Sequence, residues 1–187
     1  ELIRSATFDR WLSGLRDRRA VARIAARLDR LASGNPGDAQ PVGDGVSELR
    51  INYGPGYRVY FIQRGPVLII LLCGGDKSSQ DKDIKQAKFF GRTVKGLSMR
   101  EEQFARYDIA DCLKTEEDIA AYLEAVMEEG GNDPAYIARA LGVVARARNM
   151  TALAQEVGMS RVGLNKALSG EGNPTLSTVL KVAKALG

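Results

Sequence analysis

The chain has 187 residues, of which 44% are hydrophobic and 27% charged, and it carries a formal net charge of +4 at neutral pH. It contains no histidine, so the commonest general base is missing, and its two cysteines, Cys73 and Cys112, are too few for a structural zinc site. The longest apolar run, residues 66–73, is too short to cross a bilayer. We therefore expect a cytoplasmic protein without a metal, a cofactor or a membrane partner.

The charge falls into three blocks. Residues 1–98 hold 17 basic and 10 acidic side chains, residues 99–133 hold 3 and 11, and residues 134–187 hold 7 and 2. The net charges of the blocks are therefore +7, −8 and +5. Blocks of one sign inform about binding partners rather than about the fold. Their order predicts two domains that bind polyanions, with an anionic competitor between them.

Helical and then strand periodicity organise the first 92 residues. Apolar side chains recur at helical spacing in 8–15 and 21–31, which predicts two amphipathic helices. The Gly- and Pro-rich stretch 33–45 is expected to be a loop, and 79–90 a polar helix. Three β-rich stretches separated by tight turns lie between them: 46–52, 57–63 and 67–73. Since short turns join neighbouring antiparallel strands, and residues 1–4 suit an opening strand, we expect an α+β domain of two helices against three or four strands.

Cations are expected to gather on one face of this sheet. Arg50 and Arg58 lie on adjacent predicted strands, both opposite the apolar side chains, and a lysine follows the last strand. Such cations can hold a phosphodiester and stabilise the charge of its transition state, while RNA supplies the 2′-OH as nucleophile. An aspartate or a tyrosine would assist proton transfer. The candidate catalytic residues are Arg58, Arg50, Lys77, Asp76 and Tyr60. Alternatively, Arg50 and Arg58 are solvated strand positions in a cross-strand pattern with Glu48.

Beyond residue 114 the pattern is helical throughout. Thr115 and Asp118 are spaced as a capping box, with Asp in place of Glu, ahead of an apolar stripe. Asn173-Pro174 is a second signal for a helix start. Helices are expected after residue 115 and at 134–149, 151–157, 160–168 and 175–186.

Residues 151–168 have the spacing of a helix-turn-helix. Gly158 permits the positive φ of the tight turn, and Ser160 caps the second helix. The N-terminal residues of such a helix reach base edges in the major groove, and Arg and Asn suit guanine and adenine. The candidate DNA-binding residues are Ser160, Arg161, Val162, Asn165 and Lys166. The alternative is a small helical bundle with an exposed basic helix.

Five motifs of the first half resemble the phage Gp49-like, HigB-type branch of the RelE/ParE toxin superfamily. They are WLSGLRD (11–17), GNPGD (34–38), SELRI (47–51), YGPGYRVYF (53–61) and LCGGDKS (72–78). The resemblance implies a RelE/ParE-like fold and an mRNA endoribonuclease (an mRNA interferase) that acts on mRNA in the ribosomal A site. It also implies that Arg58 is the catalytic strand arginine and that Arg50 and Lys77 flank it. Related toxins have a His or Tyr near the C-terminus where this chain has lysines.

The second half resembles antidote proteins of the HigA-like, Xre-type class from residue 99 to the end. The motifs are EEDIAAYL (116–123), ARALGVVARARNM (138–150), MSR (159–161), LS (168–169), GNPT (172–175) and TVLK (178–181). This resemblance implies a helix-turn-helix domain that binds operator DNA and represses its own promoter. Since such proteins read paired half-sites, a homodimer is expected.

The chain thus resembles a toxin joined head-to-tail to its antitoxin. Its expected parts are a toxin domain (1–92), a seam (93–98), an acidic toxin-neutralising segment (99–133) and a DNA-binding domain (134–187). An acidic helix could cover the basic toxin face, within one chain or between chains, and inhibit the enzyme. The candidate neutralising residues are Glu116, Glu117, Asp118, Tyr122 and Glu124. Two alternatives are a DNA-binding regulator that carries an inactive toxin fold, and a toxin that targets gyrase.

Overall fold

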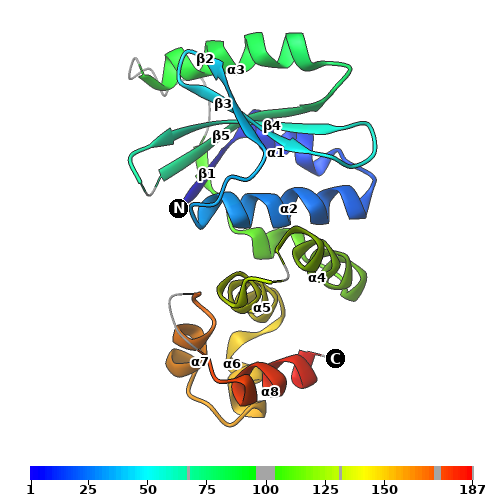
Figure 1. The fold of residues 1–187 in the computed structure, drawn as a ribbon, viewed down its shortest axis with the longest axis vertical. Helices are drawn as coiled ribbons and strands as arrows, with labels where there is room; N and C mark the ends of the chain where they lie inside the picture. The colour runs from blue at the N-terminus through cyan, green and yellow to red at the C-terminus, as the bar shows by residue number, and fades with distance from the viewer. Residues whose placement is uncertain (67, 96–103, 131, 171–173, 187) are drawn as a thin grey trace. The chain divides into compact units, whose positions relative to one another are not determined.

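The computed structural model describes residues 1–66, 68–95, 104–130, 132–170 and 174–186. The chain divides into two compact units, residues 1–108 and 109–187 (Figure 1). The start of the expected seam, residues 93–95, belongs to a helix, whereas residues 96–103 lie outside the described residues. None of the described helices is long and apolar enough to cross a membrane.

A six-stranded sheet forms the centre of the first unit. Its strands are β1 (Leu2–Ser5), β2 (Ala39–Gly43), β3 (Val46–Ile51), β4 (Tyr57–Arg64), β5 (Leu68–Asp76) and β6 (Phe104–Arg106). Their order is β2-β3-β4-β5-β1-β6. The segment β2 to β5 is an antiparallel meander joined by tight turns, as the turn lengths predict. β1 lies parallel to β5, and β6 lies antiparallel to β1.

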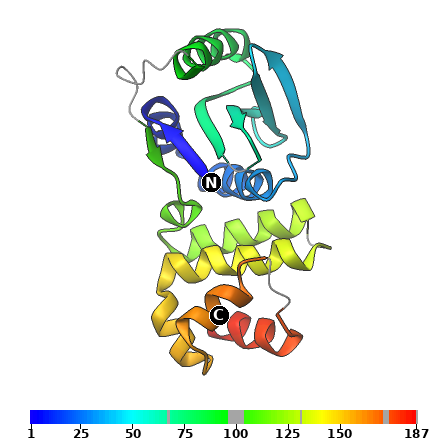
Figure 2. The ribbon, with the colours of Figure 1, turned by 90° about the vertical axis from the view of Figure 1, so that its left-hand side faces the viewer.

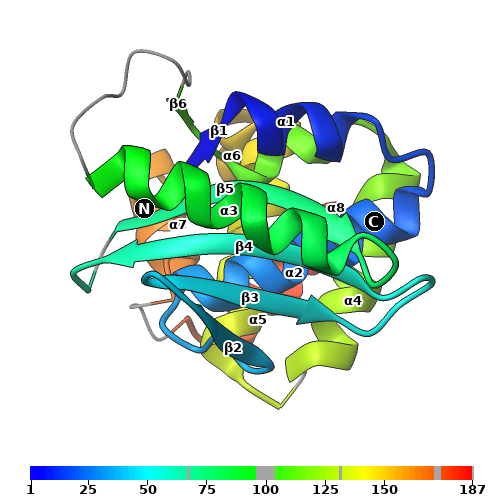
Figure 3. The same cartoon turned by 90° about the horizontal axis from the view of Figure 1, so that it is seen from above.

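Helices cover both faces of this sheet (Figures 1 and 3). α1 (Ala6–Ser13) and α2 (Arg18–Ala32) lie on one face, and α3 (Gln80–Lys95) lies on the other. Two adjacent glycines of β5 mark the two faces. A Cβ atom on Gly74 would clash with the ring of Trp11 in α1, and one on Gly75 would clash with Oδ2 of Asp83 in α3. The sheet therefore has a buried core on each side, and any polar cluster on it lies under a helix or at the end of one.

Three expectations about the sheet are wrong. The expected loop 33–45 contains β2, because Pro41 is tolerated on an edge strand, where a missing N–H costs little. The acidic segment contains β6, which has three residues and is too short to show a periodicity. The sheet therefore has six strands instead of three or four. The polar helix expected at 79–90 is confirmed, although it continues to Lys95.

All the secondary-structure elements described in the second unit are helical (Figure 2). Its elements are a 3₁₀ turn (Ile109–Cys112), α4 (Glu116–Gly130), α5 (Pro134–Arg148), α6 (Met150–Glu156), α7 (Arg161–Ala167) and α8 (Leu176–Leu186). Side chains cap several of these helices as their sequences predict. The carboxylate of Asp133 caps α5, and the side-chain oxygen of Asn149 caps α6. The helix start expected at residue 134 is confirmed, and α6 begins one residue before the expected position 151. Asn173, which belongs to the other expected start signal, lies outside the described residues.

Candidate functional site

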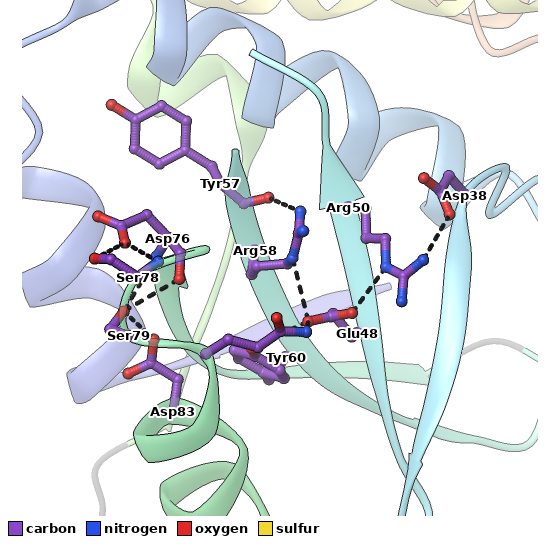
Figure 4. Close-up of polar contacts among 11 residues, drawn as sticks. Asp38, Glu48, Arg50, Tyr57, Arg58, Tyr60, Asp76, Ser78, Ser79 and Asp83 are labelled. Carbon is purple, nitrogen blue, oxygen red and sulfur yellow. Dashed lines mark hydrogen bonds and ion pairs between the residues drawn. The ribbon is translucent and has the colours of Figure 1, made fainter. Parts of the chain in front are cut away.

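A buried carboxylate organises the polar face of the sheet (Figure 4). Glu48 in β3 is 0% exposed, and its Oε2 accepts a hydrogen bond from Nε of Arg50 at 2.9 Å. Its Oε1 accepts hydrogen bonds from the Tyr60 hydroxyl at 3.2 Å and from Nε2 of Gln80 at 2.7 Å. Nε of Arg58 lies 3.3 Å from the same oxygen. Three elements, β3, β4 and α3, thus supply donors to one carboxylate.

Strand register brings this cluster together. Glu48 pairs with Tyr60 and Arg50 pairs with Arg58 across β3 and β4, so all four side chains leave the sheet on the same face. Alternation along each strand also places apolar neighbours such as Leu49 on the other face, where Leu49 is fully buried. The predicted placement of Arg50 and Arg58 on one face is confirmed.

Arg58 is held in place mainly by charge. It is only 9% exposed, and its Nη1 donates a hydrogen bond to the carbonyl oxygen of Tyr57 at 3.3 Å. Its Nε is within ion-pair distance of Glu48 but makes no hydrogen bond among the described residues, because the geometry is poor. The alternative of a solvated position is therefore wrong for Arg58. Arg50 is partly exposed, and the hydrogen bond to Glu48 raises its pKa.

Tyr60 is a neutral hydrogen-bond donor in this cluster. It is fully buried, and burial, followed by the nearby charge of Glu48, raises the pKa of its hydroxyl above the ordinary value. A tyrosine of raised pKa loses its proton reluctantly. Its geometry therefore suits hydrogen bonding to Glu48 and the positioning of that carboxylate better than transfer of a proton.

Asp76 and Lys77 lie where β5 ends, and Lys77 comes close to Arg58. A Cβ atom on Gly56, which has a φ of +79°, would lie 3.6 Å from Cβ of Lys77 and 3.9 Å from Nη1 of Arg58. The carboxylate of Asp76 accepts hydrogen bonds from the amide and the hydroxyl of Ser78, and these lower its pKa. An open hollow of about 520 Å³ is lined by Lys77, Ser78, Ser79, Gln80, Asp81 and Lys82.

Sequence reasoning missed Asp83 as a member of this region. Asp83 is 7% exposed, accepts a hydrogen bond from the Ser79 hydroxyl, and has a raised pKa because it is buried. The helical spacing of the sequence could have predicted that Asp83 is buried, since Asp83 shares one helical face with Ala87 and Val94, which are both buried. Glu48 was likewise noted only as a cross-strand partner, although it is the centre of the cluster. No group of three His, Cys, Asp or Glu side chains among the described residues could hold a metal ion.

The predicted DNA-reading helix is α7. Gly158 has a φ of +71° in the turn after α6, and the Ser160 hydroxyl accepts a hydrogen bond from the amide of Gly163 at 3.0 Å. Leu164 is fully buried, so the opposite face of α7 points to solvent. The predicted outward-facing residues are all exposed, with Val162 at 79%: Arg161, Val162, Asn165 and Lys166.

The acidic residues of α4 have partners inside the helical unit. The carboxylate of Asp118 accepts hydrogen bonds from the amides of Lys114 and Thr115, and its own amide donates to the Thr115 hydroxyl, which confirms the predicted capping box. Glu116 forms an ion pair with Arg148. Among the other candidate neutralising residues, Tyr122 is fully buried, whereas Glu117 and Glu124 are exposed.

One comparison with known proteins concerns the second half of the chain. Residues 103–187 match the model of a protein family described as "Probable addiction module antidote protein". Two relatives from Haemophilus influenzae (strain ATCC 51907 / DSM 11121 / KW20 / Rd), each described as "Uncharacterized protein", are similar to this chain. One is 60% identical over 88 residues, which are 47% of this chain and 89% of the relative. The other is 51% identical over 85 residues, which are 46% of this chain and 86% of the relative. No solved structure matches the chain.

Proposed function

The chain belongs, through residues 103–187, to the family of probable addiction module antidote proteins, and we propose that its first 95 residues are the toxin that this half restrains. An antidote implies a toxin as partner. Residues 1–102 precede the antidote match, and they are basic. The proposed module is therefore a HigB-type toxin with a RelE/ParE-like fold, followed by a HigA-like antitoxin.

The proposed activity is cleavage of mRNA on the ribosome, and the cluster around Glu48 carries this proposal. Arg58 has a fixed position beside Gly56 and Lys77, where its guanidinium can neutralise charge that develops on a phosphodiester. Arg50 lies on the paired position of the next strand and adds a second cation. The 2′-OH of RNA attacks the adjacent phosphorus and gives up its proton, while the bond from phosphorus to the 5′-oxygen of the next nucleotide breaks and that oxygen takes up a proton. This leaves a 2′,3′-cyclic phosphate, so the protein itself needs no nucleophile.

Proton transfer is the less defined part of the proposed reaction. Tyr60 is neutral, fully buried and donates a hydrogen bond to Glu48, so we assign it to positioning of the arginines. Asp76 is ionised over a wider pH range than an ordinary aspartate, because Ser78 hydrogen-bonds to its carboxylate, and an ionised carboxylate next to Lys77 in the chain can accept a proton.

Expression of residues 1–95 alone tests the proposal that this half is an enzyme that cleaves mRNA. We expect this fragment to stop growth and to cleave translated mRNA, whereas the full chain does neither. Arg58→Ala should abolish both effects, since one charge-stabilising group is typically worth 10²–10³ in rate. Arg92→Ala is the matched control, because Arg92 is exposed and pairs with Asp44 at the surface.

The same experiment separates the alternatives. A folded fragment, verified by circular dichroism, that neither slows growth nor cuts mRNA would contradict the enzyme reading and favour a regulator with an inactive toxin fold. DNA damage without mRNA cleavage would instead indicate a gyrase-targeting toxin.

A second proposed activity, binding of operator DNA by the antidote half, is supported by α7. Its exposed face carries Arg161, Asn165 and Lys166, which have the donor geometry for base edges and phosphates. Binding at the promoter of the module would repress its own transcription. Because a helix-turn-helix reads paired half-sites, this activity requires a homodimer.

A further inference from the structure

Residues 104–108 follow the undescribed residues 96–103. They belong both to the sequence match with the antidote family and to the first compact unit. The match to the antidote family begins at residue 103, whereas the first compact unit extends to residue 108. Residues 104–108 therefore belong to the antidote half by sequence and to the first unit by structure. They comprise β6, Tyr107 and Asp108.

The backbone of this segment pairs with the edge of β1. Phe104, Ala105 and Arg106 are opposite Ser5, Arg4 and Ile3. The pairing continues one residue further, because the amide of Tyr107 donates a hydrogen bond to the carbonyl oxygen of Leu2 at 3.0 Å. The other edge of β1 is already used by β5. Without residues 104–107, β1 would be an edge strand with unpaired backbone groups, a template for the addition of another strand.

Two aromatic side chains fix the segment on opposite faces of the sheet. Phe104 packs against the core on the α3 side, which includes Ile70, Leu72 and Val94. Tyr107 is only 4% exposed and meets Phe8 of α1 edge to face, with ring centroids 5.9 Å apart. A slip of one residue would exchange the two faces, so these anchors define a single register.

A charged side chain completes the site for Tyr107. The guanidinium of Arg4 lies over the Tyr107 ring, 5.4 Å from its centroid, and Asp9 of α1 holds Arg4 by an ion pair of 3.2 Å. A cation over an aromatic face is attracted by the ring. The edge of β1 thus offers backbone hydrogen bonds, an apolar contact on each side and a cation, all directed at one extended segment.

We propose that residues 104–107 are a docking anchor, by which the antidote half is held on the toxin sheet through strand addition. The names toxin and antidote rest on the proposed function, but the docking itself does not. In the sheet order, β5 and β1 lie between β6 and β4, so the anchor pairs at a distance from Arg58 and retains the antidote half without itself covering the arginine cluster. The anchor makes the covalent connection dispensable: the two halves stay together after the chain is cut between them.

Cleavage of the full chain tests this inference. A recognition sequence for a site-specific protease is inserted between residues 96 and 97, the purified protein is cut, and the halves are separated by gel filtration at low salt and at about 1 M salt, which screens surface charge. We expect the halves of the wild type to co-elute at both salt concentrations. Phe104→Ala with Tyr107→Ala should weaken the complex by about 100-fold or more, so that the halves separate.

The matched control is Phe89→Ala, which truncates an aromatic side chain of α3 that is 63% exposed and leaves the anchor intact. Its halves should co-elute like the wild type. Separation of the wild-type halves, or co-elution of the halves of the anchor variant, would overturn the proposal. Co-elution does not depend on toxicity, so this result stands apart from the test of RNA cleavage.

Hydrogen exchange on the uncut wild type covers the case in which the anchor variant fails to fold. The amide of Tyr107 should exchange at least about tenfold more slowly than an unstructured amide, because it is paired with Leu2. Exchange at the unprotected rate would overturn strand addition directly.

Discussion

Glu48 is a carboxylate that the fold buries completely, and it is balanced by the charges of two arginines. Burial of a charge without partners is strongly unfavourable, whereas a buried group with several donors is tolerated. The partners of Glu48 come from two strands and from the first residue of α3. The carboxylate therefore ties the position of Arg58 to the docking of α3.

Replacement of Glu48 by glutamine tests this role. Glu48→Gln keeps the shape but leaves Arg58 buried without a counter-charge, so we expect a loss of about 3–5 kcal/mol in the free energy of unfolding. Urea titration measures the loss. Asp44→Asn, which removes the charge of an exposed ion pair with Arg92, should cost less than about 1 kcal/mol. Equal stabilities of the Glu48→Gln variant and the wild type would show that the carboxylate does not hold the cluster.

Asp83 and Asp76 should affect stability in opposite ways as the pH changes. Burial raises the pKa of Asp83 in the folded state, so its contribution to stability is present below the unfolded pKa and is lost as the pH rises through the folded pKa. Hydrogen bonds from Ser78 lower the pKa of Asp76, so its contribution is present above the unfolded pKa and is lost as the pH falls through the folded pKa.

Two asparagine variants measure these signs. Between about pH 3 and about pH 7, Asp83→Asn should gain stability relative to the wild type as the pH rises, whereas Asp76→Asn should lose it. Denaturant titration at several pH values gives both trends. Parallel trends for the two variants would contradict the assigned environments.

The short secondary-structure elements of this chain are harder to predict from the sequence than the long ones. α2 and α5 have apolar periodicity, caps and sufficient length, so their sequence patterns predict them well. β2 and β6 have neither a clear alternation nor favourable composition, and each exists because a neighbouring strand offers it backbone partners. The anchor Tyr107 escaped prediction for the same reason, since its partners Leu2 and Phe8 are about a hundred positions away in the sequence.

The exposed face of α7 can be tested as a DNA reader. Arg161→Ala and Asn165→Ala should each weaken binding to a duplex selected from random-sequence DNA by about 5- to 150-fold and relax the preference at one base position. Electrophoretic mobility shift at fixed salt measures the effect. Gln155→Ala is the matched control, because Gln155 is exposed on α6, the helix before the turn. Unchanged affinity in both α7 variants would contradict the DNA-reading assignment.

The three charge blocks of the chain correspond to its proposed partners. The basic first unit and the basic end suit RNA and DNA, and the acidic block between them suits a competitor for one of these surfaces. Docking through residues 104–107 adds a specific contact to this general attraction. A covalent connection raises the effective concentration of the second half to about the millimolar range, so even a weak anchor stays occupied. The homodimer expected from the helix-turn-helix remains a prediction.

The sequence alone was sufficient for features that depend on nearby residues. Helix spacing, the capping box at Thr115 and Asp118, the turn at Gly158 and the alternation that puts Arg50 and Arg58 on one face all follow from local geometry. Only the tertiary structure decided which groups become buried together. Gln80 reaches Glu48 across 32 positions, and Phe104 and Tyr107 reach the edge of β1 from the far end of the unit. Such contacts depend on the packing of the whole chain, because burial and pairing are set by neighbours in space.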